Sequence, residues 1–148
     1  MKSTLRLAVL SALFMSSMAH AAEQLTIDVH RDAQCGCCKQ WISHHEENGF
    51  KVIDHVEDDM SLVKQRLGVA PRLASCHTGV INGQFIEGHV PAEQVIALSK
   101  RPDLRGLAVP GMPMGSPGME MGDRRDAFQV IGLTRSGTDE VIAEYPGR

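Results

Sequence analysis

Three cysteines stand within four residues of this chain, at Cys35, Cys37 and Cys38, and a fourth follows at Cys76. Four cysteines could in principle form two structural disulfides. The spacing argues against that pairing, because a disulfide between the neighbours Cys37 and Cys38 is strained and three thiols so close together cannot all be structural cross-links. The cluster therefore predicts a chemical role, either thiol–disulfide exchange or metal binding.

The cluster is expected at the junction between a strand and a helix. Residues 25–30 alternate apolar and polar side chains, which is typical of a strand, and residues 37–48 are predicted to form a helix that ends at Gly49. Cys35 and Cys38 then have CxxC spacing at a helix N-terminus, where unpaired N–H groups favour thiolates. Exchange needs only two cysteines. The surplus Cys37 therefore favours a metal site, since thiolates can bridge soft ions such as Cu(I).

The next segments suggest a familiar domain. Residues 50–56 are predicted as a strand and residues 58–67 as a helix ended by Gly68. Residues 80–86 form a hairpin pattern with an Asn82-Gly83 turn, and Pro91 opens a helix to about residue 100. The order βαβαββα is that of a thioredoxin-like α/β domain. We expect residues 22–148 to form this one domain, with a C-terminal extension and a final β-hairpin over 128–133 and 141–145.

The segment before the third strand lies against the active-site loop in thioredoxin-like domains. Cys76, in Ser75-Cys76-His77-Thr78, should therefore approach Cys35 and Cys38, although a lone buried cysteine is the alternative. His77 is a weaker candidate ligand, because adjacent strand residues point to opposite faces. His89 follows Gly88 and could lie at the rim of the site or be an exposed capping residue.

Residues 107–122 differ from the rest of the chain. They are rich in glycine and proline, so we expect neither a regular helix nor a central strand there. They also contain the four methionines of the extension, which are Met112, Met114, Met119 and Met121. Thioether sulfur is a soft ligand that suits Cu(I), and Met112 and Met119 are the predicted ligands. Filling of core gaps is the alternative for each methionine. Zinc is the competing metal, but a structural zinc site does not call for a methionine loop.

The other histidines and the single tryptophan receive ordinary interpretations. Trp41 is predicted to be a core residue of the first helix. The histidines away from the cysteine loop are predicted at surface positions and not as ligands; they are His30, His44, His45 and His55.

The first 21 residues are typical of a signal peptide. Basic Lys2 and Arg6 precede an apolar run over residues 7–15, which is too short to span a bilayer, and Ala19-His20-Ala21 gives a small-x-small cleavage pattern. We therefore expect export to the periplasm, cleavage after Ala21 and no membrane insertion. Loss of Lys2 and Arg6 changes the formal net charge from −3 to −5. The absence of a basic face argues against nucleic acid as a partner.

Four motifs in order resemble the CopG-type periplasmic copper-resistance proteins, which are thioredoxin-like proteins with a CxCC motif. The motifs are Cys35-Gly36-Cys37-Cys38-Lys39-Gln40-Trp41, Ser75-Cys76-His77-Thr78, Glu87-Gly88-His89-Val90-Pro91 and the segment 106–120. The resemblance implies a cysteine-bridged multi-copper cluster beside the CxCC loop, with Cys35, Cys37, Cys38 and Cys76 as thiolate ligands. His77, His89 and the methionine loop would then be candidates to complete it.

The resemblance also implies a role in copper resistance, with interconversion of Cu(I) and Cu(II) in support of copper export. Copper ions are then the expected partners, together with components of copper efflux, and the protein is expected to be a monomer. Two alternatives stay open. One is a periplasmic thiol–disulfide oxidoreductase that depends on Cys35 and Cys38, and the other is a passive copper chaperone or buffer without turnover.

Overall fold

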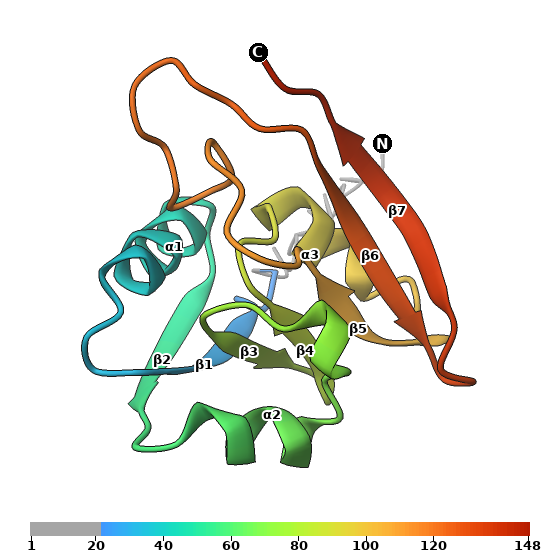
Figure 1. Ribbon diagram of the computed structural model, residues 1–148. Coiled ribbons are helices and arrows are strands. Elements are labelled where there is room, and N and C mark those ends of the chain that lie inside the picture. The colour runs from blue at the N-terminus through green and yellow to red at the C-terminus, as the bar shows by residue number, and fades with distance from the viewer. Residues whose placement is uncertain (1–21) are drawn as a thin grey trace, which may run out of the picture.

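The computed structural model describes residues 22–148, so the predicted signal peptide at residues 1–21 lies outside the described part of the chain (Figure 1). Within residues 22–148, no helix is long and apolar enough to cross a membrane. The described elements are three α-helices, one 3₁₀ helix and seven strands. In chain order they are β1 (Thr26–Arg31), α1 (Gly36–Glu47), β2 (Lys51–Val56), α2 (Met60–Leu67), η1 (Pro71–Leu73), β3 (Thr78–Ile81), β4 (Gln84–Glu87), α3 (Ala92–Leu98), β5 (Leu104–Ala108), β6 (Phe128–Thr134) and β7 (Asp139–Tyr145).

All seven strands join one mixed sheet in the order β2-β1-β3-β4-β5-β6-β7. β1 pairs with β2 in parallel and with β3 in antiparallel, and β3 and β4 form a hairpin. This part has the predicted βαβαββα order and confirms the thioredoxin-like α/β class. β5, β6 and β7 extend the sheet on the β4 side, and β6 and β7 form the predicted terminal hairpin.

Local signals define several element boundaries as predicted. The Asp59 carboxylate accepts hydrogen bonds from the backbone N–H groups of Ser61 and Leu62 at the start of α2, and Gly68 ends this helix in the left-handed conformation. Asn82 and Gly83 both have positive φ, 49° and 76°, as a type I′ hairpin turn requires. Pro91 lies one position earlier than predicted, as the N-cap of α3.

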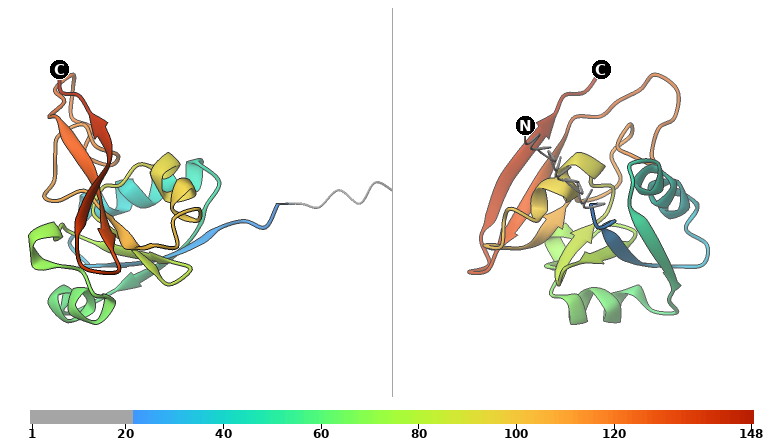
Figure 2. Two further views of the ribbon diagram at one scale, coloured as in Figure 1. Left: turned by 90° about the vertical axis from the view of Figure 1, so that its right-hand side faces the viewer. Right: turned by 180° about the vertical axis from the view of Figure 1, so that it is seen from behind.

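The main core lies between the sheet and the helices α1 and α3, while α2 lies on the opposite side of the sheet (Figures 1 and 2). Trp41 of α1 is fully buried there, as predicted, and its indole N–H donates to the Val90 carbonyl oxygen at 2.9 Å. The close approach extends to the sheet, because a Cβ on Gly79 would lie 3.5 Å from the Trp41 ring.

Two sequence predictions are wrong. Leu107 and Ala108 belong to β5, an interior strand, whereas an irregular segment was expected from residue 107; the prolines that forbid a strand begin only at Pro110. His45 is fully buried and not at the surface. It lies one helical turn after Trp41, so its ring packs against the indole in a tilted arrangement, at a centroid distance of 3.8 Å, and faces the core.

The glycine- and proline-rich segment between β5 and β6 folds back over α1 (Figure 1). At its closest point, a Cβ on Gly118 would lie 2.8 Å from the Trp41 nitrogen and 3.0 Å from the Cys37 carbonyl oxygen. Gly118 also has a φ of 87°, which glycine adopts without strain. The segment is therefore packed directly on the helix turn that carries the cysteines.

Candidate metal centre

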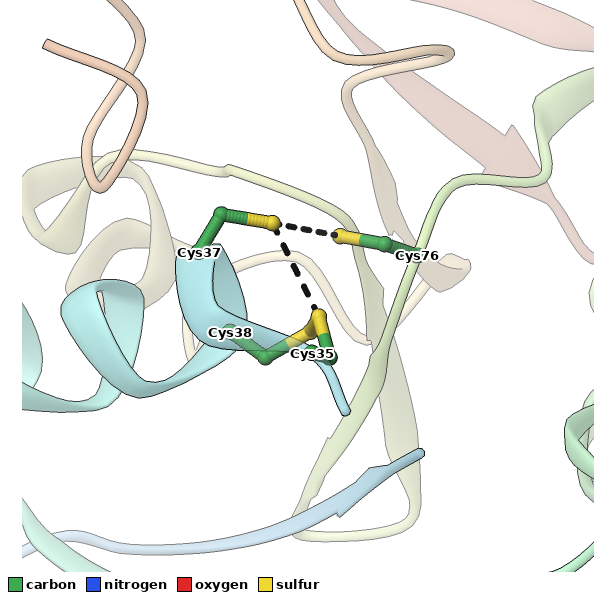
Figure 3. A group of neighbouring side chains, drawn as sticks. All are labelled: Cys35, Cys37, Cys38 and Cys76. Atoms are coloured by element: carbon green, nitrogen blue, oxygen red, sulfur yellow. Dashed lines mark hydrogen bonds between the residues drawn. A yellow bond between two sulfur atoms is a disulfide. The ribbon is translucent and has the colours of Figure 1, made fainter. Parts of the chain in front are cut away.

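Three cysteines occupy the first turn of α1. Cys35 is the N-cap and its backbone N–H donates to the Asp32 carbonyl oxygen at 3.2 Å, which closes the turn after β1. Cys35 and Cys38 form a disulfide, so the two members of the CxxC pair are oxidised (Figure 3). Cys37 is a free thiol that is partly exposed, and its sulfur lies 3.7 Å from that of Cys35.

Cys76 brings the fourth sulfur to this turn from a segment 39 residues away. Its Sγ lies 3.9 Å from the Cys37 Sγ, on the side of the cysteine turn that faces the β3–β4 hairpin (Figure 3). All four sulfurs lie within 4.8 Å of one another. The predicted approach of Cys76 to Cys35 and Cys38 is therefore confirmed, and the four sulfurs form a group of the size that can hold metal.

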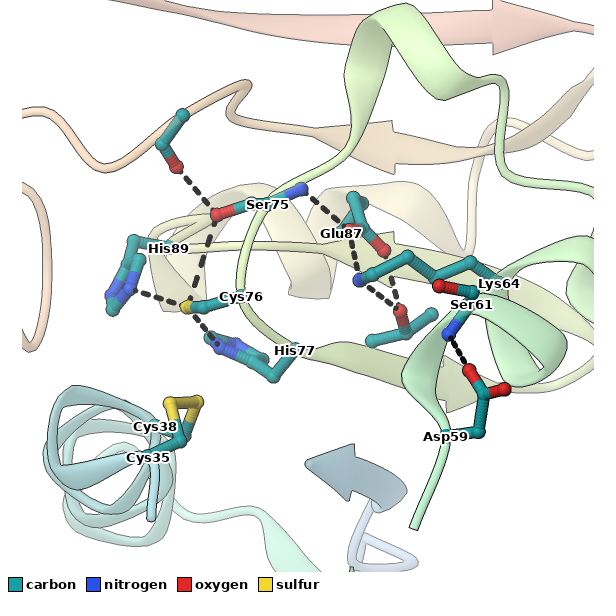
Figure 4. Close-up of polar contacts among 12 residues, drawn as sticks. Cys35, Cys38, Asp59, Ser61, Lys64, Ser75, Cys76, His77, Glu87 and His89 are labelled. Atoms are coloured by element: carbon teal, nitrogen blue, oxygen red, sulfur yellow. Dashed lines mark hydrogen bonds and ion pairs between the residues drawn. A yellow bond between two sulfur atoms is a disulfide. The ribbon is translucent and has the colours of Figure 1, made fainter. Parts of the chain in front are cut away.

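Two imidazoles flank Cys76 (Figure 4). His77 Nδ1 lies 3.2 Å and His89 Nε2 lies 3.1 Å from the Cys76 Sγ. His77 precedes β3 and His89 follows β4, and the pairing of Thr78 with Glu87 holds these ends of the hairpin together. The backbone N–H of Gly88 also donates to the His77 carbonyl oxygen at 3.0 Å. Cys76, His77 and His89 therefore form a second potential ligand group that shares Cys76 with the first.

The tautomer of His89 follows from its neighbours. Its Nδ1 lies 2.7 Å from the Pro117 carbonyl oxygen, which can only accept, so Nδ1 carries the proton and donates. In the neutral ring, Nε2 then has a free lone pair, and this lone pair faces Cys76. A hydrogen bond on the distal nitrogen is the arrangement usual for metal-binding histidines. Burial lowers the pKa of His89 and so favours the neutral ring that a metal needs.

His77 is completely buried against Trp41, with ring centroids 4.4 Å apart. Burial, with a smaller effect of the nearby His89, lowers its pKa well below the ordinary value, so this ring is also neutral. Its Nε2 is buried without a hydrogen-bond partner within residues 22–148. Nδ1 is thus the nitrogen of His77 that can interact with Cys76 or with an ion beside it.

The Cys76 thiol is protonated in the absence of a cation. Burial is the main cause that raises its pKa to about 12, and the nearby Cys37 acts in the same direction. Two neutral imidazoles give no positive charge to stabilise a thiolate. A metal ion would supply that charge, and its binding would release the thiol proton.

A buried ion pair on the opposite side of the sheet supports the Cys76 segment (Figure 4). The Glu87 carboxylate is fully buried, pairs with Lys64 Nζ of α2 and accepts the Thr78 hydroxyl. It also accepts the backbone N–H of Ser75 at 2.7 Å, one residue before Cys76. Burial raises the pKa of Glu87, and Lys64 opposes that shift. The pair thus fixes the backbone from which Cys76 projects.

The two predicted methionine ligands each follow a glycine that contacts the region of the centre. Met112 follows Gly111, whose carbonyl oxygen accepts the Ser75 hydroxyl, and Met112 is 54% exposed. Met119 follows Gly118, the residue packed on α1, and is partly buried. The structure therefore places the loop at the centre, while the two thioethers as ligands stay a prediction.

Sequence reasoning missed the residues that support the centre. Neither the Pro117 carbonyl nor the Glu87–Lys64 pair was expected to act on it. Glu87 gave a usable signal, because an acidic residue at the end of the apolar strand pattern Phe85-Ile86 must find a partner if it is buried. A backbone carbonyl such as that of Pro117 gives no signal in the sequence.

Known proteins resemble the chain closely. The Form 2 structure of "Copper resistance protein copG" is 69% identical, covers 84% of this chain and 100% of its own, and superimposes with a TM-score of 0.83. The Form 1 structure is 70% identical with the same coverage and a TM-score of 0.82. A family model described as "Protein of unknown function, DUF411" matches residues 73–119, which include Cys76, His77 and His89. No curated protein sequence matches the chain.

Proposed function

The chain belongs to the family of the copper resistance protein CopG, and from this membership we propose that it binds copper at the cysteine and histidine centre and interconverts Cu(I) and Cu(II). The observation that carries the proposal is the position of Cys76. Its sulfur lies 3.9 Å from Cys37 on α1 and 3.1 Å from His89 after β4. The Cys76 sulfur therefore belongs both to the group of four cysteine sulfurs and to the group with the two imidazoles.

The donor set suits copper in both oxidation states. Thiolates are soft ligands that favour Cu(I) and can bridge several ions, while neutral imidazole also binds Cu(II). We propose Cys35, Cys37, Cys38, Cys76, His77 and His89 as ligands of a multinuclear copper site, with Met112 and Met119 as further candidates. The Cys35–Cys38 disulfide must be reduced before these two sulfurs can act as thiolates. Each interconversion moves one electron per copper, to or from an external carrier.

The setting follows from the sequence. We propose that residues 1–21 are a signal peptide and that the protein acts as a monomer in the periplasm, where it would exchange copper with efflux components. Fractionation of cells that produce the full chain, with mass measurement of the mature N-terminus, tests this part. A mature protein that starts at Ala22 in the periplasmic fraction is the expected result.

Copper content of anaerobically reduced protein tests the metal site. The protein should take up copper, and Cys76→Ser should remove most of it, because this change interrupts both ligand groups. Cys38→Ser should also remove most of the copper. Asn48→Ser, at the exposed end of α1, is a control that should bind as the wild type does. Unchanged copper content in both cysteine variants would refute the proposed site.

Thiol–disulfide exchange is the second candidate, and the disulfide itself favours it. Cys35 is partly exposed at the N-cap, whereas Cys38 is fully buried, so only one sulfur of the pair is accessible to an external thiol. This function predicts reduction of insulin disulfides without copper, with loss in Cys35→Ser and no effect of Cys76→Ser. A passive copper buffer is distinguished by ascorbate and oxygen cycling, since a buffer would keep its copper in one oxidation state.

A further inference from the structure

The disulfide divides the potential ligands into two sets. A disulfide sulfur is not a thiolate, so the Cys35–Cys38 bond removes both sulfurs from metal binding. The group of Cys76, His77 and His89 contains neither of them. One complete set of three potential ligands is therefore present in the oxidised protein.

The second set is held in place by contacts that do not involve Cys35 or Cys38. Hydrogen bonds of the β3–β4 hairpin hold its two ends, which carry His77 and His89. Ser75 N–H on the Glu87 carboxylate fixes the segment before Cys76. The Pro117 carbonyl orients His89. None of these contacts uses Cys35 or Cys38, so opening or closing their disulfide leaves the three donor atoms facing one another.

The chemistry of this set fits one divalent ion. Both imidazoles are fully buried, with a nitrogen of each within 3.2 Å of the Cys76 sulfur. One thiolate and two neutral imidazoles give a single negative charge and mixed nitrogen and sulfur donors, as in the His₂Cys sites of copper proteins, and both donor types also bind Zn(II). Cys37 Sγ, 3.9 Å from Cys76 Sγ, lies where a fourth ligand could enter.

We propose that the Cys35–Cys38 disulfide switches the centre between two metal-binding modes. With the disulfide closed, the protein holds one divalent ion at Cys76, His77 and His89. With the disulfide reduced, two further thiolates convert the site into the thiolate-rich centre of the proposed function, on which this inference rests. The disulfide therefore selects whether the centre takes a single divalent ion or a Cu(I)-type cluster.

The switch requires an external dithiol as reductant. One thiolate of that dithiol attacks the partly exposed Cys35 sulfur, and the S–S bond breaks with Cys38 leaving as a thiolate. The second thiolate of the reductant then attacks the mixed disulfide and releases Cys35. Two electrons pass to the protein, the reductant leaves as a disulfide, and its two protons are available to the two cysteines.

Anaerobic titration with Co(II) tests the inference, because Co(II) does not oxidise thiols and its charge-transfer absorption grows with the number of bound thiolates. Disulfide-intact protein should bind one Co(II) per chain with the absorption of one or two thiolates. Dithiothreitol-reduced protein, freed of the reductant, should show roughly twice that absorption. The Cys35→Ser/Cys38→Ser double variant should give the low-intensity spectrum under both conditions.

Variants of the second set complete the test. His89→Gln or Cys76→Ser should abolish Co(II) binding by disulfide-intact protein, with far-UV circular dichroism to verify folding. His55→Gln, which changes a histidine outside the centre, should have no effect. Identical spectra of the oxidised and reduced wild type, no binding by the oxidised protein, or binding that survives both variants would overturn the switch. Copper uptake by reduced protein would still support the proposed function in any of these cases, whereas its absence would refute that function separately.

Discussion

Removal of the Glu87 carboxylate tests how the centre is supported. Glu87→Ala leaves the Lys64 ammonium without its partner. This pair is buried, because the side chain of Glu87 is 0% exposed and that of Lys64 is 16% exposed. The Ser75 N–H and the Thr78 hydroxyl lose their acceptor in the same change. Breaking a buried ion pair in this way costs about 3–5 kcal/mol, so Glu87→Ala should lower the free energy of unfolding by that amount.

A double-mutant cycle separates the ion pair from simple loss of packing. Lys64→Met alone leaves an uncompensated buried carboxylate and should also destabilise the protein. The double variant Lys64→Met/Glu87→Ala leaves no charge behind, so it should be more stable than the sum of the single changes predicts, by about 1–3 kcal/mol. Replacement of a buried pair is often far less costly than removal of one partner.

Urea unfolding of the disulfide-intact, metal-free protein provides the measurement, with fluorescence of Trp41, the single tryptophan, as probe. Hydrogen exchange adds a local readout. The Ser75 amide should exchange much faster in Glu87→Ala, because its acceptor is gone, and should stay protected in Lys64→Met. Destabilisation below 1 kcal/mol, or strictly additive effects in the cycle, would show that the pair does not hold this region.

Two further predictions concern the loop over α1 and the buried His45. Gly118→Ala should cost about 2–4 kcal/mol in urea unfolding and weaken Co(II) binding, because its Cβ would meet backbone atoms of α1 at 2.8 and 3.0 Å and would lift Pro117 from His89. Gly122→Ala, which has a φ of 61° and open space around its Cβ, should cost only about 1–2 kcal/mol, and equal losses in the two variants would contradict the packing argument. Burial lowers the pKa of His45 from 6.5 to about 3, so between these values the unfolded chain binds a proton that the folded protein does not. Stability should therefore be retained above pH 6.5 and lost on acidification, and His45→Phe should reduce this loss by up to about 1.4 kcal/mol per pH unit, measured from urea midpoints at pH 7 and pH 5.

The features that sequence predicts well are those set by neighbouring residues. Asp59 and Gly68 delimit α2, and Asn82-Gly83 forms the turn between β3 and β4, because each of these features depends on the conformation of a few residues. The approach of Cys76 to Cys35 and Cys38 was also predictable, once the element order identified a thioredoxin-like domain. The order fixes which loop lies beside the N-terminus of α1.

The features that sequence did not predict depend on distant parts of the chain. β5 is recognisable as a strand only through its pairing with β4 and β6. In the sequence, its last residues run directly into a segment that is rich in proline and glycine from residue 110. His45 is polar, and its burial depends on the indole of Trp41 and the ring of Phe50 beside it. The Glu87–Lys64 pair joins residues 23 positions apart, on β4 and α2. No local pattern specifies such a contact.

The three segments of the centre carry different ligands, and this division bears on the proposed chemistry. The α1 turn carries the disulfide pair, the β3–β4 hairpin carries Cys76 and both imidazoles, and the loop over α1 orients His89. A centre that accepts copper in two oxidation states needs soft thiolates for one state and harder nitrogen donors for the other. If all donors were on one element, a change in the disulfide would disturb every ligand at once. With the donors divided, the thiolate number can change at α1 while the hairpin keeps the imidazoles in place.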